Sequence, residues 1–170
     1  MNRSVLWLLI ASAVTVPAFF VTAWVMPQVT MLVVMSRLGP LAGVNRLFHT
    51  PPPTHESFAV VTPSPDLAYS ICIFDLADGP VQVIADYPEG AYWSISAYAY
   101  NTDNFFVAND QTTDAPPARF VFGTNSDRDD VIVSPSRRGV ILLRHHIADP
   151  DAIALIDERR KNSICEPLAE

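Results

Sequence analysis

The feature that most restricts this chain is an uncharged stretch near its start. Between Ser4 and Ser36 there is no Asp, Glu, Lys or Arg. A membrane span takes about 20 apolar residues, because the hydrocarbon core is ~30 Å thick, and the run from Val5 to Met26 supplies them. The backbone finds no water in lipid, so this run is expected to be helical. Pro17 predicts a kink, and Trp24 lies where interfacial aromatic residues collect.

Two other interpretations of this stretch remain open. A cleaved signal peptide fits the small residues Val21-Thr22-Ala23 and the single Arg3 before the run, although the run is longer than the usual ~7–15 residues. A buried helix of a soluble domain is the third reading. We favour the uncleaved anchor because apolar residues continue beyond it, from Val29 to Met35.

The segment after Pro27 predicts two further short helices. Gln28–Leu38 is expected to lie at the membrane surface, with Gly39-Pro40 ending it and one or two helical turns over Leu41–Phe48. The triplet Pro51-Pro52-Pro53 predicts a stiff spacer. The resulting division is a transmembrane anchor and interfacial helix over 1–36, a helical and proline-rich spacer over 37–56, and an exported β domain over 57–170.

The charges restrict the partners and the location. The net charge is −7, and residues 47–118 carry nine acids and no Lys or Arg. Nucleic-acid binders present a basic face, so a nucleic-acid partner is not expected. Arg3 precedes the span while Arg37 and Arg46 follow it, so the positive-inside rule sets no direction. The cysteines favour the inner (plasma) membrane with the C-terminal domain in the periplasm.

The rest of the chain predicts a mainly β domain. Expected strands, from alternation and turn punctuation, are Leu67–Asp75, Val81–Tyr87, Ala91–Tyr100, Phe105–Ala108, Arg119–Gly123, Val131–Val133 and Gly139–Ile147. A helix is expected over Pro150–Lys161, with its basic residues suiting the C-terminal end of the helix dipole. This pattern predicts a small antiparallel β-barrel or sandwich with a C-terminal helix, preceded by the transmembrane helix.

One face of a predicted strand is a candidate binding surface. In Ala91–Tyr100, alternation places Tyr92, Tyr98 and Tyr100 with two serines on one face. Aromatic groups with a few polar neighbours can line a ligand pocket, and Asp66 and Asp110 are candidate acids beside it. A surface covered by a partner or left as plain sheet exterior is the other interpretation. Alternation also places His145 and His146 on opposite faces, so Arg144 and His146 share one face.

The two cysteines and one turn are structural candidates. Cys72 and Cys165 are 93 positions apart, and a disulfide between them in an oxidising compartment would close a long loop; two unrelated thiols are the alternative. Asp75 ends a strand, where its carboxylate can accept turn N–H bonds, and Gly79-Pro80 then reverses the chain. We expect Asp75 to form the turn rather than to act as a catalytic acid.

The region from Pro63 to Thr113 resembles the domain-of-unknown-function 1254 family of bacterial proteins, in its short, membrane-anchored branch. The matching residues are Pro65-Asp66 before a strand, Cys72, Phe74-Asp75-Leu76 with Gly79-Pro80, the aromatic run Tyr92–Ser96, and Asn109-Asp110. Val140–Arg144 and Cys165 also fit. The resemblance implies a β-barrel-like domain and a partner carrying the companion domain-of-unknown-function 1214, with no established activity. Ile73 departs from the pattern, where a basic residue is expected.

No common catalytic motif occurs in the chain. G-x-S-x-G, H-E-x-x-H, G-x-G-x-x-G, C-x-x-C and a Walker loop are all missing, and we expect no metal, no cofactor and no catalytic residue. Two hypotheses remain. The favoured one is a single-pass inner-membrane protein that presents a periplasmic β domain as an envelope interaction module. The alternative is a membrane-tethered enzyme or small-ligand binder that uses the Tyr-rich face.

Overall fold

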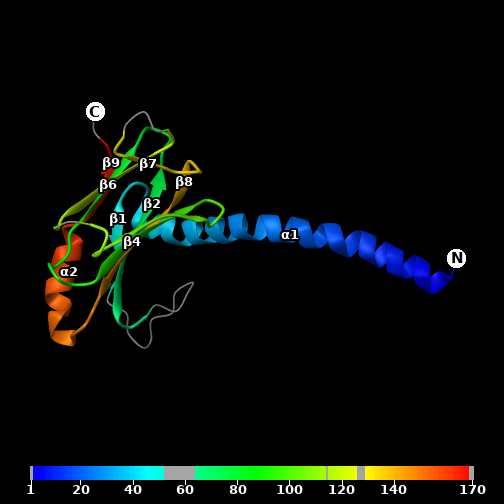
Figure 1. Cartoon of the computed structure of the whole chain (residues 1–170), viewed down its shortest axis with the longest axis horizontal. Coiled ribbons are helices and arrows are strands. Elements are labelled where there is room, and N and C mark those ends of the chain that lie inside the picture. The colour runs from blue at the N-terminus through cyan, green and yellow to red at the C-terminus, as the bar shows by residue number, and fades with distance from the viewer. Residues whose placement is uncertain (1, 52–63, 114, 126–128, 169–170) are drawn as a thin grey trace.

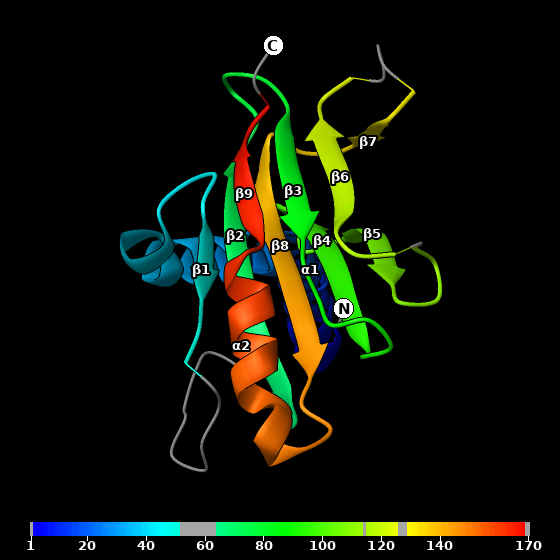
Figure 2. The same ribbon diagram turned by 90° about the vertical axis from the view of Figure 1, so that its left-hand side faces the viewer.

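A long helix leads into a mainly β domain built from two sheets and a short helix (Figures 1 and 2). The computed structural model describes residues 2–51, 64–113, 115–125 and 129–168. The mainly β fold with an N-terminal apolar helix and a C-terminal helix is confirmed. Its two separate sheets correspond to the sandwich rather than the barrel.

The first helix, α1 (Arg3–Ala42), is continuous through three prolines, Pro17, Pro27 and Pro40. The expected helix end at Pro27 and the separate helices over Gln28–Leu38 and Leu41–Phe48 are therefore wrong. Each proline removes one N–H from the helical ladder, which apolar membrane-type helices tolerate. The helix ends at Gly43, whose φ of +73° favours glycine, and the Gly43 N–H donates to Gly39 O at 2.9 Å.

The two ends of α1 have different surroundings. The helix is ~60 Å long at 1.5 Å per residue, and its N-terminal part projects from the domain (Figure 1). Its most apolar 18-residue window has a mean hydropathy of 2.2 and none of it is buried, so a buried helix of a soluble core is wrong. A membrane span and a signal sequence both fit this window. Met31 and Ala42, nearer the domain, are buried.

The larger sheet contains five antiparallel strands in the order β1-β2-β8-β4-β5. Their bounds are Leu47–His49 (β1), Leu67–Asp75 (β2), Arg138–His146 (β8), Trp93–Ala99 (β4) and Asn104–Asn109 (β5). β2 pairs with β8 along its whole length, from Leu67 opposite His146 to Asp75 opposite Arg138. These two strands form the centre on which the other elements pack.

The smaller sheet has the order β7-β6-β3-β9 and contains one parallel pair, β6 with β7. Its strands are Val131–Val133 (β7), Ala118–Gly123 (β6), Val81–Ala85 (β3) and Ile164–Pro167 (β9). A 3-10 turn, η1 (Pro150–Ala152), and α2 (Ile153–Lys161) connect β8 to β9. β1 and β9 were not expected from the sequence, because three or four residues are too short to show a period.

The main core lies between the two sheets. Trp93, Ile95 and Ala97 of β4 face it and are fully buried, as the alternation predicted, together with Phe74 and Phe122. A second cluster lies on the opposite, outer face of the larger sheet, where Met31 and Ala42 of α1 pack with two sheet residues. Those residues are Ile73 and Val140. The departure at Ile73 is thus an apolar residue buried beneath α1.

The predicted domain boundaries cross these elements. α1 continues through the boundary between 36 and 37, and β1 belongs to the larger sheet although it falls within the segment assigned to the spacer. Pro51 is described, whereas the rest of the proline triplet lies outside the described residues. The division of the chain into anchor, spacer and domain remains a prediction.

Candidate functional site

The predicted tyrosine face is divided between the two ends of β4. Tyr98 and Tyr100 are half-buried and pack against the cluster beneath the end of α1. Tyr92 precedes the other end of the strand and is 45% exposed. Its backbone carbonyl accepts the His146 N–H at 3.0 Å. The three tyrosines therefore do not line one pocket, because α1 covers the part of the face that holds two of them.

The two candidate acids lie at the same sheet end as Tyr92. Asp66 O accepts the Ile147 N–H at 2.8 Å, and the Asp110 N–H donates to Trp93 O at 3.4 Å. Both acids are exposed. Asp66 immediately precedes β2, and Asp110 begins the loop after β5. The strands β8 and β4 therefore lie between them, and three strand spacings of ~4.8 Å separate them. The structure does not pair these carboxylates.

A polar row crosses the outer face of the larger sheet below the part that α1 covers. Register places Tyr69 of β2, Arg144 of β8, Ser94 of β4 and Asn109 of β5 side by side. Sequence reasoning noted Arg144 and the serines and named Asn109 only as a residue of the family resemblance, but it missed Tyr69. Tyr69 lies in a strand that is apolar on both faces.

The polar row contains unsatisfied groups. Arg144 Nη2 donates to Ser96 Oγ at 2.8 Å, and this is its one hydrogen bond to the described residues. Arg144 Nε and Ser94 Oγ are buried without a hydrogen-bond partner. Beside them, the rings of Tyr92 and His146 pack edge to face, with their centroids 6.5 Å apart. Buried polar atoms are nearly always bonded in folded proteins, so this pair requires an explanation.

A second polar cluster is buried under α2. Arg160 is 1% exposed, and it donates to Tyr69 O at 2.8 Å, to Thr50 O at 2.7 Å and to the Asp157 carboxylate. The sequence analysis placed Arg160 among the basic residues that suit the C-terminal end of the helix dipole. Its side chain instead points inward and joins α2 to the backbone of β2 and of the residue after β1.

Two histidines border this buried cluster. His49 Nδ1 lies 2.8 Å from Ser70 Oγ, and burial, followed by the Arg160 charge, lowers the pKa of His49. Burial lowers the pKa of His145 to about 4, and its Nε2 lies 3.2 Å from Asp86 O. His145 and His146 point to opposite sheet faces, as predicted. Ser70 is fully buried, and its hydroxyl is hydrogen-bonded to His49 within the fold.

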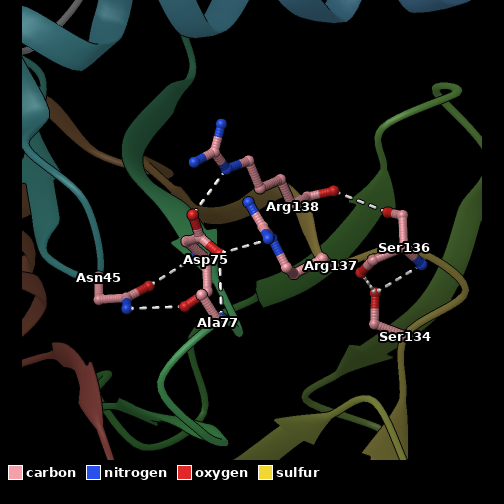
Figure 3. Close-up of polar contacts among 7 residues, drawn as sticks. All are labelled: Asn45, Asp75, Ala77, Ser134, Ser136, Arg137 and Arg138. Carbon is pink, nitrogen blue, oxygen red and sulfur yellow. Dashed lines mark hydrogen bonds and ion pairs between the residues drawn. The ribbon is translucent and has the colours of Figure 1, made fainter.

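The Asp75 carboxylate makes several hydrogen bonds and ion pairs at the end of β2 (Figure 3). Its Oδ1 accepts the Ala77 N–H at 3.0 Å, and its Oδ2 accepts the Arg138 Nε–H at 2.6 Å. Arg137 Nε lies 3.3 Å from Asp75 Oδ1 and forms a second ion pair. Burial favours a raised pKa, but these hydrogen bonds and the two positive charges outweigh it and lower the pKa of Asp75. The turn role assigned to Asp75 accounts for these contacts. Gly79, with φ +129°, completes the reversal before Pro80.

A disulfide connects the two sheets. Cys72 of β2 and Cys165 of β9 are bonded, with their Cα atoms 6.4 Å apart, and both side chains lie in the main core. An open groove of about 530 Å³ lies beside this link, between the end of α1, β1 and β9. Among the described residues, no group of three His, Cys, Asp or Glu side chains is arranged to hold a metal ion.

These features define a disulfide-linked β sandwich carried on a long apolar helix. The chain belongs to the family described as "Protein of unknown function (DUF1254)", whose model matches residues 44–167. The matched region begins just after α1 and ends with β9. The resemblance noted in the sequence is therefore confirmed.

Solved structures share the fold. The VPA0106 protein from Vibrio parahaemolyticus matches with a TM-score of 0.63 at 14% identity, over 84% of this chain and 35% of that chain. An uncharacterised protein from Burkholderia cenocepacia matches with a TM-score of 0.53 at 16% identity, over 85% of this chain and 40% of that chain. No curated protein sequence matches the chain. The chain thus spans well under half the length of these two structural neighbours.

Proposed function

We propose that this chain is a single-pass protein of the inner membrane that presents its β domain to the periplasm as an envelope interaction module. The observation that carries the proposal is the two-part character of α1. From Ser4 onward its N-terminal part is uncharged, apolar and exposed, and its C-terminal turns pack onto the larger sheet through Met31 and Ala42. Residues 3–26 extend for ~36 Å as a helix, enough to cross a hydrocarbon core of ~30 Å.

The disulfide supports a periplasmic location for the domain. Disulfides persist in oxidising compartments such as the bacterial periplasm and are rare in the cytosol. Cys72 and Cys165 are the only cysteines in the chain, and their bond lies inside the domain that α1 would hold at the membrane. Export and the disulfide thus support each other.

The lengths of the structural neighbours support an interaction role. This chain covers 35% and 40% of those two proteins, so they contain further segments that could act together with the shared fold. We propose that the domain acts with a partner protein that carries the companion domain-of-unknown-function 1214, as the family resemblance implies. In-cell crosslinking with a photoreactive residue at exposed Ile164, beside the open groove, tests this, with the same group at exposed Arg119 as control. A clean monomer at both positions contradicts the proposed partner.

The anchor has a direct test. Val14→Arg places a charge at the middle of the span, at a cost of about 3 kcal/mol, whereas Ser36→Arg adds the same charge beyond it. We expect carbonate-washed vesicles to retain the wild-type chain and Ser36→Arg, and to lose much of Val14→Arg. A C-terminal reporter should be active only outside the cytosol. A mature mass that begins at Trp24, or a reporter active in the cytosol, contradicts the anchored periplasmic module.

A ligand-binding role is the second candidate. The specific observation in its favour is the set of unsatisfied groups on the outer sheet face around Arg144. This role is compatible with anchoring, because the same chain can hold a ligand and a partner at different surfaces.

A further inference from the structure

The outer face of the larger sheet changes character along its strands. Near the end of α1 its rows are apolar, with Ile73, Val140 and Tyr98 beneath the helix. Two rows further along, β8 places Arg144 beside Ser94. α1 therefore covers the apolar rows, while the polar row lies outside the second apolar cluster.

Arg144 is a half-buried cation with little to balance it. Its guanidinium has five N–H donors, yet Ser96 Oγ is its one hydrogen-bond acceptor among the described residues, and it forms no ion pair with them. Removing a charge from water without a partner is costly. Elsewhere in the same domain, Arg160 is fully supplied with two backbone carbonyls and a carboxylate. Arg144 is thus a half-buried arginine whose positive charge is not paired with a carboxylate among the described residues.

The hydroxyls of Ser94 and Ser96, beside Arg144, do not complete the hydrogen bonding of this group. Ser96 is fully buried and its Oγ already accepts from Arg144. Ser94 is 3% exposed, and its Oγ has no hydrogen-bond partner. A hydroxyl donates one hydrogen bond, so a guanidinium and a free hydroxyl side by side present donors without an acceptor. Oxyanions are the ligands that satisfy such a set, and arginine binds carboxylate and phosphate through paired N–H groups.

The position of the site relative to α1 fits a ligand at the membrane surface. In Figure 2, α1 lies behind the strands and runs away from the viewer, and in Figure 1 its N-terminal part projects to one side of the domain. α1 packs on the same sheet face that holds Arg144 and Ser94. When α1 spans a bilayer, this face is directed toward the lipid headgroups. Tyr92, at the edge of the face, is 45% exposed and suits an interfacial position.

We propose that Arg144, Ser94 and Ser96 form a binding site for an oxyanion, with His146 and Tyr92 at its border. The ligand chemistry is a phosphate or carboxylate group, which an acidic phospholipid headgroup or a free anion could supply. Arg144 holds the charge, Ser96 fixes the guanidinium, and the Ser94 hydroxyl donates the bond that lacks an acceptor. The lipid source rests on the proposed membrane anchoring, whereas a free anion does not require it.

The test uses the full-length chain and variants of equal charge. Arg144→Gln removes the proposed charge. Arg119→Gln removes an exposed arginine from β6 in the other sheet, where its side chain hydrogen-bonds only to Gln82 among the described residues. Thermal unfolding of detergent-solubilised protein is measured with inorganic phosphate and acetate against chloride at equal ionic strength. Lipid capture is measured by native mass spectrometry after reconstitution into phosphatidylcholine mixed with phosphatidylglycerol.

Either of two results supports the site. Phosphatidylglycerol that is retained by wild type and Arg119→Gln, but about tenfold less by Arg144→Gln, assigns the site to a headgroup. Stabilisation by phosphate or acetate that is lost only in Arg144→Gln assigns it to a free anion. Ser94→Ala guards against misfolding, because it removes an unbonded buried hydroxyl. It should leave the ligand-free protein at least as stable as wild type while it lowers anion binding severalfold.

Other results overturn the inference. Equal binding by Arg144→Gln and Arg119→Gln, or no response of the wild type to either lipid or anion, rejects the site. If the chain stays in carbonate-washed membranes while Arg144→Gln binds normally, the site fails and the anchor stands. If the chain washes off the membrane but phosphate still stabilises it through Arg144, the anchor fails and the site stands.

Discussion

Breaking the disulfide between Cys72 and Cys165 should remove a large part of the stability of the domain. The bond closes a loop of 93 residues. The chain-entropy relation gives about 4.6 kcal/mol at 25 °C for a loop of this length. Single domains are typically stable by ~5–15 kcal/mol, so reduction should bring the protein close to its unfolding threshold at physiological temperature.

The location of the bond makes this effect visible in one element. β9 is a four-residue edge strand that pairs only with β3 among the described strands. Without the bond, four residue pairs hold it to the smaller sheet, and its link to β2 in the larger sheet is lost. We therefore expect β9 to separate first, which should appear as faster amide exchange at Ile164, Cys165 and Glu166.

The assay is urea unfolding of the full chain in detergent, followed by near-ultraviolet circular dichroism with and without reductant. Oxidised protein should unfold at clearly higher urea, and the reduced form should have a steeper slope because its unfolded state exposes more surface. A Cys72→Ala/Cys165→Ala variant controls for the reductant, which should not affect it. Coincident curves for the oxidised and reduced protein, or two free thiols in natively extracted protein, would refute the reasoning.

Three further perturbations follow from single contacts. Gly139→Ala places a Cβ 2.1 Å from a backbone oxygen of β4, whereas a Cβ at Gly39 meets nothing within 4 Å. Thermal unfolding should show that Gly139→Ala loses about 2 kcal/mol or more of stability, whereas Gly39→Ala is neutral or slightly stabilising. Equal effects of the two substitutions would contradict this packing. Burial lowers the pKa of His145 to about 4, below an unfolded value of ~6.5. The neutral imidazole therefore contributes roughly 3 kcal/mol to the free energy of unfolding, a contribution that is complete above pH ~6.5 and is lost as the pH falls toward 4. Urea midpoints should fall as the pH is lowered across this range, and a flat profile would argue against a buried neutral imidazole. Asp75→Ala removes the turn bond and the Arg138 contact and should lower the free energy of unfolding by about 1–2 kcal/mol, whereas an unchanged urea midpoint would show that the turn does not depend on this carboxylate.

Local patterns in the sequence were sufficient for the longer strands. Leu67–Asp75 and Val131–Val133 match β2 and β7 residue for residue. Trp93, Ile95 and Ala97 face the core because alternation in a strand assigns side chains to faces without knowledge of the rest of the fold. The Asp75 turn was equally local, since its acceptor and donor are two residues apart.

Sequence patterns failed where a residue's role depends on a distant segment. β1 is a strand because β2 offers it a free edge, not because three residues prefer that conformation. Arg160 lies in a run of basic residues typical of a solvated helix end, yet carbonyls contributed by Thr50 and Tyr69 draw it inward. The division of the tyrosine face arose because α1 continues past Pro27 and lies across one half of it.

The sequence by itself determined that an uncharged apolar helix precedes a β domain, because charge content and residue period are properties of neighbouring positions. Tertiary structure alone decided which surface that helix covers and which it leaves open. It also placed Arg144 and Ser94 side by side, with Arg144 Nε and Ser94 Oγ both lacking a hydrogen-bond partner, through cross-strand register between residues 50 positions apart. Register of this kind is set by the packing of whole sheets, so the sequence of a single strand does not indicate which residues of another strand will lie beside it.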